Sequence, residues 1–277
     1  TRLPPEKVKE KYSITSNVFW LTNQESANGN VLRVQRPDEI VKTVRNFVEK
    51  NENGVVLLDG LEEEARGAAA IGTTRRGIGP AFVDKTGRQG IRAGDLLDKE
   101  LLRKHISEVV TAKNAIITKV YGAPPLSAKD IFDQYWGYAQ VLGPHVKDTL
   151  PIVQQALMAN DVVLLEGAQG TLLDPDFGSY PYVTSSCPTA AGGCQGAGLG
   201  PKQIDRVIGV FKAYATRVGS GPMPTELTDD IANLIRERAH EYGTTSGRPR
   251  RCGWFDGVIG RYTSEFNGLT SAIITRV

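Results

Sequence analysis

Short apolar runs recur along the chain and predict the strands of a sheet. The most continuous of them is Val162–Leu165, which holds no polar residue. An aliphatic run without polar alternation is typical of a parallel strand that is covered on both faces. Similar runs predict further strands at Asn17–Thr22, Val55–Leu58, Val207–Phe211 and Ser271–Thr275.

Apolar residues at helical spacing lie between these runs. They predict one helix that begins near Pro37 and ends before Gly54, and others over Asp98–Ala112, Asp130–Leu142, Val146–Met158 and Ile231–Tyr242. The aromatic residues of Asp130–Leu142 keep the same spacing, so we interpret them as core rather than as a stacking surface for a ligand. Strands that alternate with helices predict an α/β fold with a mostly parallel central sheet flanked by helices.

The first 60 residues differ from the rest in their sequence pattern, which predicts a separate domain. The predicted unit is βαβ-like: it consists of the strand Asn17–Thr22, the helix that begins near Pro37 and the run Val55–Leu58, and it ends at Asp59 and Gly60. A carboxylate at the end of a strand can bind Mg²⁺, although Asp-Gly after a strand is also a common turn. We therefore divide the chain into residues 1–60 and residues 61–277.

Composition narrows the class of protein. The chain has 277 residues, of which 40% are hydrophobic and 23% charged, and its net charge is only +2. Such a balance gives no global field for binding nucleic acid or an anionic membrane. No apolar run approaches the roughly 20 residues of a spanning helix, and the first residues contain no apolar signal core. We expect a soluble cytoplasmic protein.

Cysteine usage agrees with a reducing compartment. The three cysteines, Cys187, Cys194 and Cys252, are an odd number without a close pair. A metal site from Cys187 and Cys194 is the alternative, but their separation is longer than the usual ligand spacing and no histidine lies nearby. We therefore expect reduced thiols and no metal site.

Candidate chemistry concentrates in glycine-rich loops. Residues 72–79 place hydroxyls, backbone N–H groups and the guanidinium groups of Arg75 and Arg76 in one loop, which suits a phosphate. A surface turn with solvated arginines is the alternative. Gln169 follows the predicted strand Val162–Leu165 within a sharp turn, where open α/β sheets bind small molecules.

A second concentration of chemistry lies near the end of the chain. Residues 243–254 read GTTSGRPRRCGW, in which hydroxyls precede three arginines. In an extended segment Arg248 and Arg250 face one way and Arg251 the other, so two guanidinium groups can meet one anion. A generic basic patch is the alternative.

These segments together resemble adenylosuccinate synthetase over residues 62–277. The sequence motifs on which the resemblance rests are, in order, AIGTTxRGIGPAF, EGAQGTLLD, YPYVTSS, KAYxTRVGxGPxPTEL and GRxRRxGWFD. The resemblance implies a P-loop-like synthetase fold. It also implies a cytoplasmic homodimer that joins inosine monophosphate (IMP) to L-aspartate in AMP biosynthesis, with GTP and Mg²⁺, through a 6-phosphoryl-IMP intermediate.

The family's ligand contacts carry over where its motifs match. By resemblance, the IMP contacts are Thr74, Arg88, Gln169, Thr184 and Arg248, with Gln169 near the purine 6-position and Arg88 reaching across the dimer interface. The aspartate contacts are Val218, Thr245, Ser246, Arg248 and Arg250. The GTP contacts are Arg250 and Arg276.

Several family features do not occur in the sequence. The family's GDEGKGK loop supplies its general base and a Mg²⁺ ligand, and its Gly-His-Thr supplies the general acid; neither is present, and the chain stops before the family's guanine-binding Asp. Arg75 replaces a glycine, Ser246 a threonine and Pro249 an arginine. The fold would thus lack the family's own N-terminal strands and C-terminal segment, and we identify no catalytic residue beyond a supporting Gln169.

Residues 1–60 resemble, more weakly, an uncharacterised archaeal α/β domain, which indicates a chimera with a junction at Leu57–Glu62. Three functions remain open. The first is an active ligase, which requires either residues outside this chain or Asp59 as a substitute base. The second is a nucleotide-binding module without turnover, and the third is a structural hybrid without a ligand. The loss of base, acid and phosphate loop together favours impaired catalysis.

Overall fold

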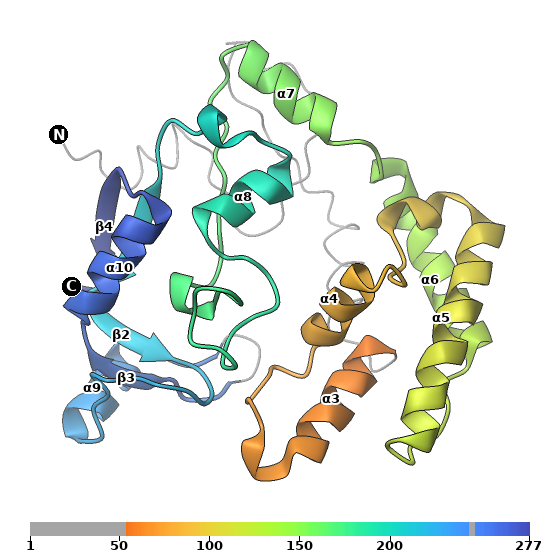
Figure 1. Ribbon diagram of the computed structural model, residues 1–277, viewed down its shortest axis with the longest axis horizontal. Coiled ribbons are helices and arrows are strands. Elements are labelled where there is room, and N and C mark those ends of the chain that lie inside the picture. Colours follow the sequence, from red (N-terminus) through yellow and green to blue (C-terminus); the bar gives the residue numbers. More distant parts are fainter. Residues whose placement is uncertain (1–53, 244–246) are drawn as a thin grey trace. The chain divides into compact units, whose positions relative to one another are not determined.

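The computed structural model describes residues 54–243 and 247–277, coloured in Figure 1. The predicted strand Asn17–Thr22 and the helix near Pro37 lie outside these residues. The described chain divides into two compact units. The first holds residues 91–107 and 128–165, and the second holds residues 54–90, 108–127 and 166–277 apart from the gap.

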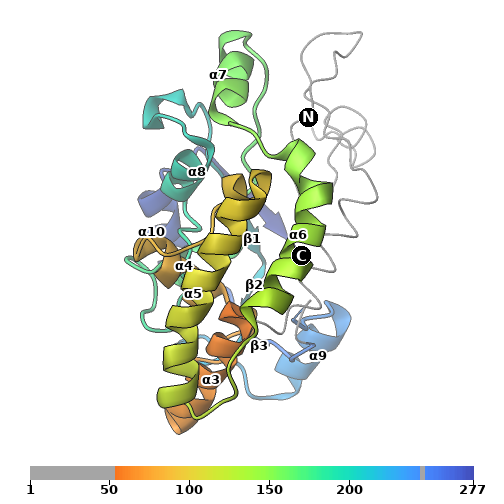
Figure 2. The same ribbon diagram turned by 90° about the vertical axis from the view of Figure 1, so that its right-hand side faces the viewer.

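The first unit is helical. It contains the 3₁₀ helices η2 (Ala93–Leu97) and η3 (Gly143–His145), the start of α5 (Lys99–Lys119), α6 (Ala128–Leu142) and α7 (Leu150–Met158). Figure 2 shows α6 beside α5. The predicted helices are confirmed, with α7 beginning four residues later than expected.

The core of this unit lies between α5 and α6. Leu102 and Ile106 are fully buried on α5, while Phe132 is buried on α6 and stacks on Trp136 at 6.4 Å between ring centroids. The guanidinium group of Arg103 lies 4.4 Å from the Phe132 ring centroid. The aromatic residues therefore pack within the protein, as expected, although only Phe132 is buried and Tyr135, Trp136 and Tyr138 are partly exposed.

Helix α5 runs seven residues beyond its predicted end at Ala112. The buried stripe of Leu102 and Ile106 continues through Val110 to Ile117, at spacings of three and four residues. Lys113 interrupts the apolar pattern, but its side chain is buried and forms an ion pair with Asp84. The buried lysine interrupts the apolar pattern, so the sequence did not predict the last seven residues of the helix.

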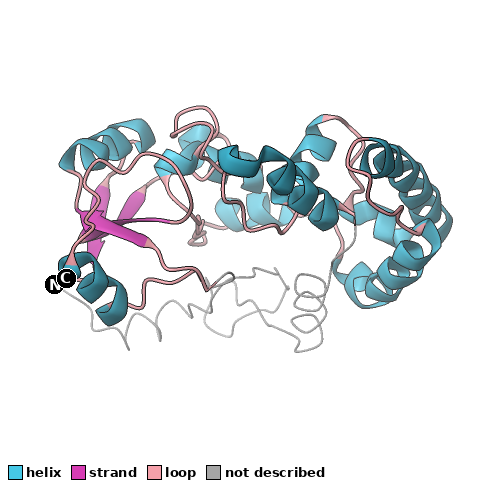
Figure 3. Cartoon of the chain, turned by 90° about the horizontal axis from the view of Figure 1, so that it is seen from below, coloured by secondary structure: helices cyan, strands magenta, loops and turns pink. Residues whose placement is uncertain are grey.

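The second unit holds the strands, magenta in Figure 3. Strand β1 (Ile208–Lys212) pairs in parallel with β4 (Ser271–Thr275), so that Ile208 lies opposite Ser271. Strand β2 (Tyr214–Arg217) pairs antiparallel with β3 (Arg251–Trp254). Two predicted strands are therefore confirmed, and the structure adds their pairing, which the sequence did not predict.

The helices of this unit are α3 (Val55–Arg66), α4 (Ile78–Thr86), α8 (Ala190–Ala197), α9 (Asp230–Arg238) and α10 (Gly257–Asn267). Its 3₁₀ helices are η1 (Gly67–Ala69), η4 (Thr171–Leu173) and η5 (Pro201–Gln203). Asp229 and Asp256 cap α9 and α10 by accepting hydrogen bonds from the first-turn N–H groups. None of the helices within the described ranges is long and apolar enough to cross a lipid bilayer.

The strand predicted at Val55–Leu58 is wrong, because these residues begin helix α3. A four-residue apolar run does not distinguish a strand from a buried helical turn. The helix buries Leu58, Asp59 and Glu63, which share one face. Asp59 therefore lies within a helix and not at the end of a strand.

The strand predicted at Val162–Leu165 is also wrong. The chain forms no strand there, and Val162 and Leu164 are 73% and 61% exposed. A parallel strand requires a neighbour for its backbone hydrogen bonds, and no strand of the described residues pairs with this segment. The segment is apolar, as the prediction assumed, but no element of the described part of the chain buries it.

Candidate functional site

Gln169 and Thr184 lie together in the second unit. The Gln169 amide donates to the Thr184 hydroxyl at 3.3 Å and accepts from the Ser186 hydroxyl at 3.3 Å. Gln169 is exposed and has a positive φ of 68°. The two predicted IMP contacts are thus neighbours although 15 residues separate them.

A tight turn over residues 172–184, here named the Thr184 turn, fixes the position of Thr184. The Thr184 N–H donates to the Leu173 carbonyl at 2.8 Å, and the buried Asp174 accepts from the N–H groups of Asp176 and Phe177. Burial alone would raise the pKa of Asp174, but hydrogen bonds from Cys187 and these two N–H groups outweigh it and lower the pKa. The turn is therefore held by an ionised carboxylate.

Two arginines hold the loop of residues 217–222, here named the Val218 loop. Arg217 donates to the Tyr182 carbonyl at 2.8 Å and to the Ser220 carbonyl at 2.8 Å. Arg251 forks onto Glu226 and donates to the Gly221 carbonyl at 2.8 Å. The loop that carries Val218 is thereby fixed against both the Thr184 turn and strand β3.

The loop of residues 71–77, here named the Thr74 loop, meets the Val218 loop and Arg248. A Cβ atom placed on Gly72 would lie 3.3 Å from the Gly219 Cα and 4.0 Å from Arg248 Nη1. A Cβ atom on Gly79, just beyond the loop, would lie 3.8 Å from the Ser185 hydroxyl. The glycines allow this close approach. The segments that carry Thr74, Thr184, Val218 and Arg248 therefore come together.

Four backbone N–H groups of the Thr74 loop are bound by carboxylates and are not the free donors that the sequence suggested. Glu63 accepts hydrogen bonds from the N–H groups of Ile71, Gly72 and Thr73, and Asp59 accepts from that of Gly77. The groups exposed on this loop are the side chains of Thr74 and Arg75. Asp59 is correspondingly occupied, which argues against its roles as a substitute base or a Mg²⁺ ligand.

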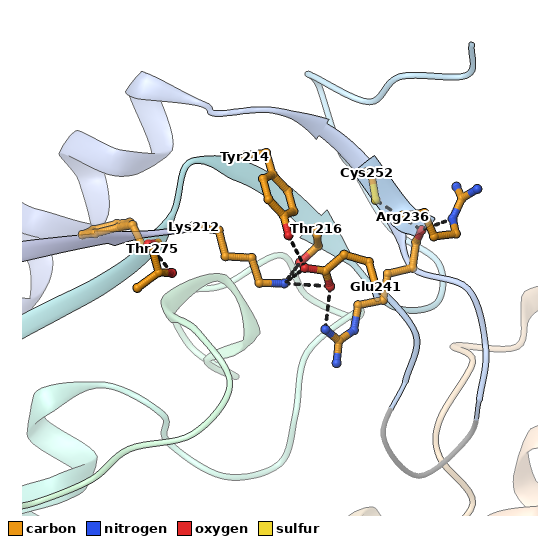
Figure 4. Close-up of polar contacts among 9 residues, drawn as sticks. Lys212, Tyr214, Thr216, Arg236, Glu241, Cys252 and Thr275 are labelled. Carbon is orange, nitrogen blue, oxygen red and sulfur yellow. Dashed lines mark hydrogen bonds and ion pairs between the residues drawn. The ribbon is translucent and has the colours of Figure 1, made fainter. Parts of the chain in front are cut away.

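Arg250 belongs to a cluster around the buried carboxylate of Glu241, drawn in Figure 4. Glu241 is 1% exposed and accepts from Arg250 Nη1 at 2.7 Å, from Lys212 Nζ at 2.8 and 2.9 Å, and from the Tyr214 hydroxyl at 2.5 Å. The Arg250 N–H also donates to the Glu241 carbonyl at 2.9 Å. Side chain and backbone thus fix Arg250.

The cluster shifts two pKa values. Burial alone would raise the pKa of Glu241, but the hydrogen bonds of Lys212, Tyr214 and Arg250 outweigh it and hold the pKa at about 2. Burial and the charge of Glu241 raise the pKa of Tyr214 to about 12. Glu241 is therefore ionised, and with two cations beside it the cluster carries net positive charge.

The other predicted contacts lie as follows. Arg88 is exposed just after α4 and has a positive φ of 62°. Arg276 follows β4, where its charge acts on Tyr214. Thr245 and Ser246 lie outside the described residues. Arg250 and Arg251 face different partners, as the alternation predicted, but the expected meeting of Arg248 and Arg250 at one anion stays a prediction.

Comparison with known sequences decides the family. The sequence model described as adenylosuccinate synthetase matches residues 53–277, which is most of the chain. The chain belongs to the adenylosuccinate synthetase family. The adenylosuccinate synthetases of Dehalococcoides mccartyi (strain 195) and Thermomicrobium roseum are 57% and 55% identical to it over 222 and 223 residues. In both cases the match covers 80% of this chain and 52% of the relative.

Solved structures agree with this assignment to the adenylosuccinate synthetase family. The fully ligated adenylosuccinate synthetase of Plasmodium falciparum superposes with a TM-score of 0.75 at 37% identity, over 80% of this chain and 52% of that one. The succinoaminodeoxyadenylate synthetase of cyanophage S-2L, at 24% identity and a TM-score of 0.50, is similar in fold alone. The α/β synthetase fold is thereby confirmed. The chain spans about half the length of the curated relatives it matches.

Sequence reasoning missed the residues that support the synthetase-family contacts. Glu241 gave no signal, because it lies 29 residues from Lys212 and 27 residues from Tyr214 in the sequence. Asp59 and Glu63, four residues apart, did give one, because that spacing places two carboxylates on one helical face. Among residues 54–243 and 247–277, no group of three or more His, Cys, Asp or Glu side chains is arranged to hold a metal ion.

Proposed function

We propose that this chain forms the IMP-binding and aspartate-binding part of a GTP-dependent carbon–nitrogen ligase that makes adenylosuccinate. The observation that carries the proposal is the meeting of the Thr74 loop, the Val218 loop and Arg248 at Gly72. A phosphate ester needs fixed hydroxyl and guanidinium donors, and these segments supply both. The hydrogen-bonded pair of Gln169 and Thr184 adds an amide suited to the purine edge.

Each ligand has its proposed contacts. IMP is held by Thr74, Arg88, Gln169, Thr184 and Arg248, and L-aspartate by Val218, Thr245, Ser246, Arg248 and Arg250. GTP is contacted by Arg250 and Arg276. The net positive charge of the Glu241 cluster supports Arg250 in binding an anion.

We propose further that these 277 residues bind IMP without completing the reaction. Phosphoryl transfer requires a phosphate loop, a base and a clamp on the developing charge. The sequence holds neither the family's base motif nor its acid motif. The described residues do not fit Mg²⁺, which the family uses with GTP, so we assign the ion no step here.

The remaining assignments rest on family resemblance. We propose a cytoplasmic homodimer in which Arg88 reaches the partner's IMP. We also propose that the chain is a chimera, in which the first part is of separate origin from the part that matches the family, residues 53–277. Recovery of an unbroken natural gene with this junction, whose product shows IMP-dependent activity, would contradict the chimera.

Isothermal titration of the full chain with IMP tests the function. We expect micromolar binding, worth roughly 8 kcal/mol, because the segments that carry Thr74, Val218 and Arg248 meet at Gly72. Arg248→Ala should weaken binding about 30-fold or more, since a charge-assisted contact to phosphate contributes roughly 2 kcal/mol or more. Adding GTP, Mg²⁺ and aspartate should yield no adenylosuccinate.

Arg261→Ala is the matched control, because it removes an exposed arginine from helix α10. It should leave the IMP affinity unchanged. Equal weakening by both variants would indicate a nonspecific charge effect. Absence of IMP binding by the wild-type chain would favour the alternative, a structural hybrid without a ligand.

A further inference from the structure

Helix α3 presents two buried carboxylates to the Thr74 loop. Asp59 and Glu63 are 4% and 3% exposed and lie four residues apart, so their side chains share one face of the helix. A buried carboxylate needs hydrogen-bond donors, because an unpaired buried charge is costly. Here most donors come from the loop, and Arg66 of the same helix donates one further hydrogen bond to Glu63 at 2.7 Å.

Both carboxylates contact Thr73, and their other contacts lie at opposite ends of the loop. Glu63 Oε2 accepts from the Gly72 N–H at 2.8 Å and from the Thr73 N–H at 3.2 Å, and Glu63 Oε1 accepts from the Ile71 N–H at 3.3 Å. Asp59 accepts from the Thr73 hydroxyl at 2.9 Å and from the Gly77 N–H at 2.9 Å. Glu63 therefore holds the beginning of the loop, while Asp59 contacts Thr73 and also holds the end of the loop at Gly77.

The fit at the end of the loop is tight. Gly77 has a φ of +77°, and a Cβ atom on it would lie 2.8 Å from backbone and side-chain atoms of Val55. Only glycine meets both conditions. Burial alone would raise the pKa of Glu63, but the Gly72, Arg66, Thr73 and Ile71 donors lower it, so the carboxylate is charged at neutral pH.

Thr74 lies between the two sets of contacts and is exposed. Because the carboxylates take the N–H groups of residues 71–73 and of Gly77, those groups are not available to a bound phosphate, and the Thr74 hydroxyl and the nearby Arg248 guanidinium are the side-chain donors that can reach it. We propose that Asp59 and Glu63 are positioning residues that shape the Thr74 loop so that Thr74 faces a phosphate ester. The phosphate part of this proposal rests on the proposed function.

Amide hydrogen exchange of the full chain, resolved by NMR, tests the shaping of the loop without any ligand. In the wild type, the N–H groups of Gly72 and Gly77 should exchange at least roughly 10-fold more slowly than that of Thr74. Glu63→Gln should accelerate exchange at Ile71, Gly72 and Thr73 by a similar factor and leave Gly77 slow.

Asp59→Asn should show the reverse pattern and accelerate exchange at Gly77. Glu64→Gln is the control, because Glu64 is exposed and contacts the side chain of Arg75 at 3.0 Å. It should change none of these rates. Exchange at Gly72 as fast as at Thr74 in the wild type would overturn the shaping, whether or not a variant folds.

Titration with IMP and with inosine, which lacks the phosphate, tests the phosphate part. Glu63→Gln should weaken IMP binding roughly 10-fold and leave inosine binding unchanged. Equal loss for both ligands would overturn the phosphate part. If the wild type binds no IMP, the proposed function and the phosphate part fall together, while the exchange rates still decide whether the carboxylates shape the loop.

Discussion

Glu241→Gln is expected to lower the free energy of unfolding by about 2–4 kcal/mol, as guanidinium chloride denaturation would measure it. The substitution keeps the shape of the side chain but removes the charge that Lys212 and Arg250 share. Loss of one member of a buried ion pair typically costs about 3–5 kcal/mol. The range is lower here because Lys212 and Arg250 are 30% and 26% exposed, so water partly solvates them in the variant.

The pH dependence identifies this charge as the cause. The pKa of Glu241 lies at about 2 in the folded chain and near its ordinary value of 4.5 when unfolded. The carboxylate therefore stabilises the fold fully above about pH 4.5, and this contribution is lost as the pH falls towards 2. The stability difference between wild type and Glu241→Gln should shrink over that window.

Glu237→Gln on α9 is the control, since Glu237 is exposed in the same region. Its effect on stability should stay within about 0.5 kcal/mol at every pH. A stability loss in Glu241→Gln that is constant between pH 6 and pH 2 would contradict the role assigned to its charge.

Gly178→Ala is expected to destabilise the protein by about 2–4 kcal/mol and to abolish measurable IMP binding. A Cβ atom at Gly178 would lie 2.3 Å from the Leu172 carbonyl oxygen and 2.4 Å from that of Asp174. Both atoms belong to the backbone, so the turn has to open. Thr184 depends on this turn through its hydrogen bond to Leu173.

Gly196→Ala is the matched substitution. Gly196 lies in α8, and nothing would lie within 4 Å of an added Cβ atom. Alanine there should raise stability by about 0.4–1 kcal/mol, because it restricts the unfolded chain and favours the helix. Equal stability changes in the two variants, measured by thermal denaturation, would show that the turn tolerates a side chain.

The sequence predicted elements where local pattern and environment agree. The runs at β1 and β4 form strands because each provides the other's parallel neighbour. Val162–Leu165 has the same pattern, but no strand of the described residues pairs with it. An apolar run thus indicates that a segment is buried in the folded protein, but it does not identify the strand or helix that packs against it.

The site was predictable to a different extent. Motif resemblance selected Thr74, Gln169, Thr184 and Arg248, and the structure brings their segments together in one unit. The supporting contacts were not predictable, because Glu241 meets Lys212 across 29 residues of sequence. The sequence suggested free N–H groups in the Thr74 loop, but Asp59 and Glu63 bind several of them. This could not be predicted, because it depends on where helix α3 lies relative to the loop.

Hydrogen–deuterium exchange of the full chain with and without saturating IMP, read by mass spectrometry, tests the central claim most directly. If IMP binds where these segments meet, the Thr74 loop, residues 169–186 and the Val218 loop should all exchange more slowly in its presence. Unchanged exchange in all three, or protection confined to the helical unit of α6 and α7, would contradict the site.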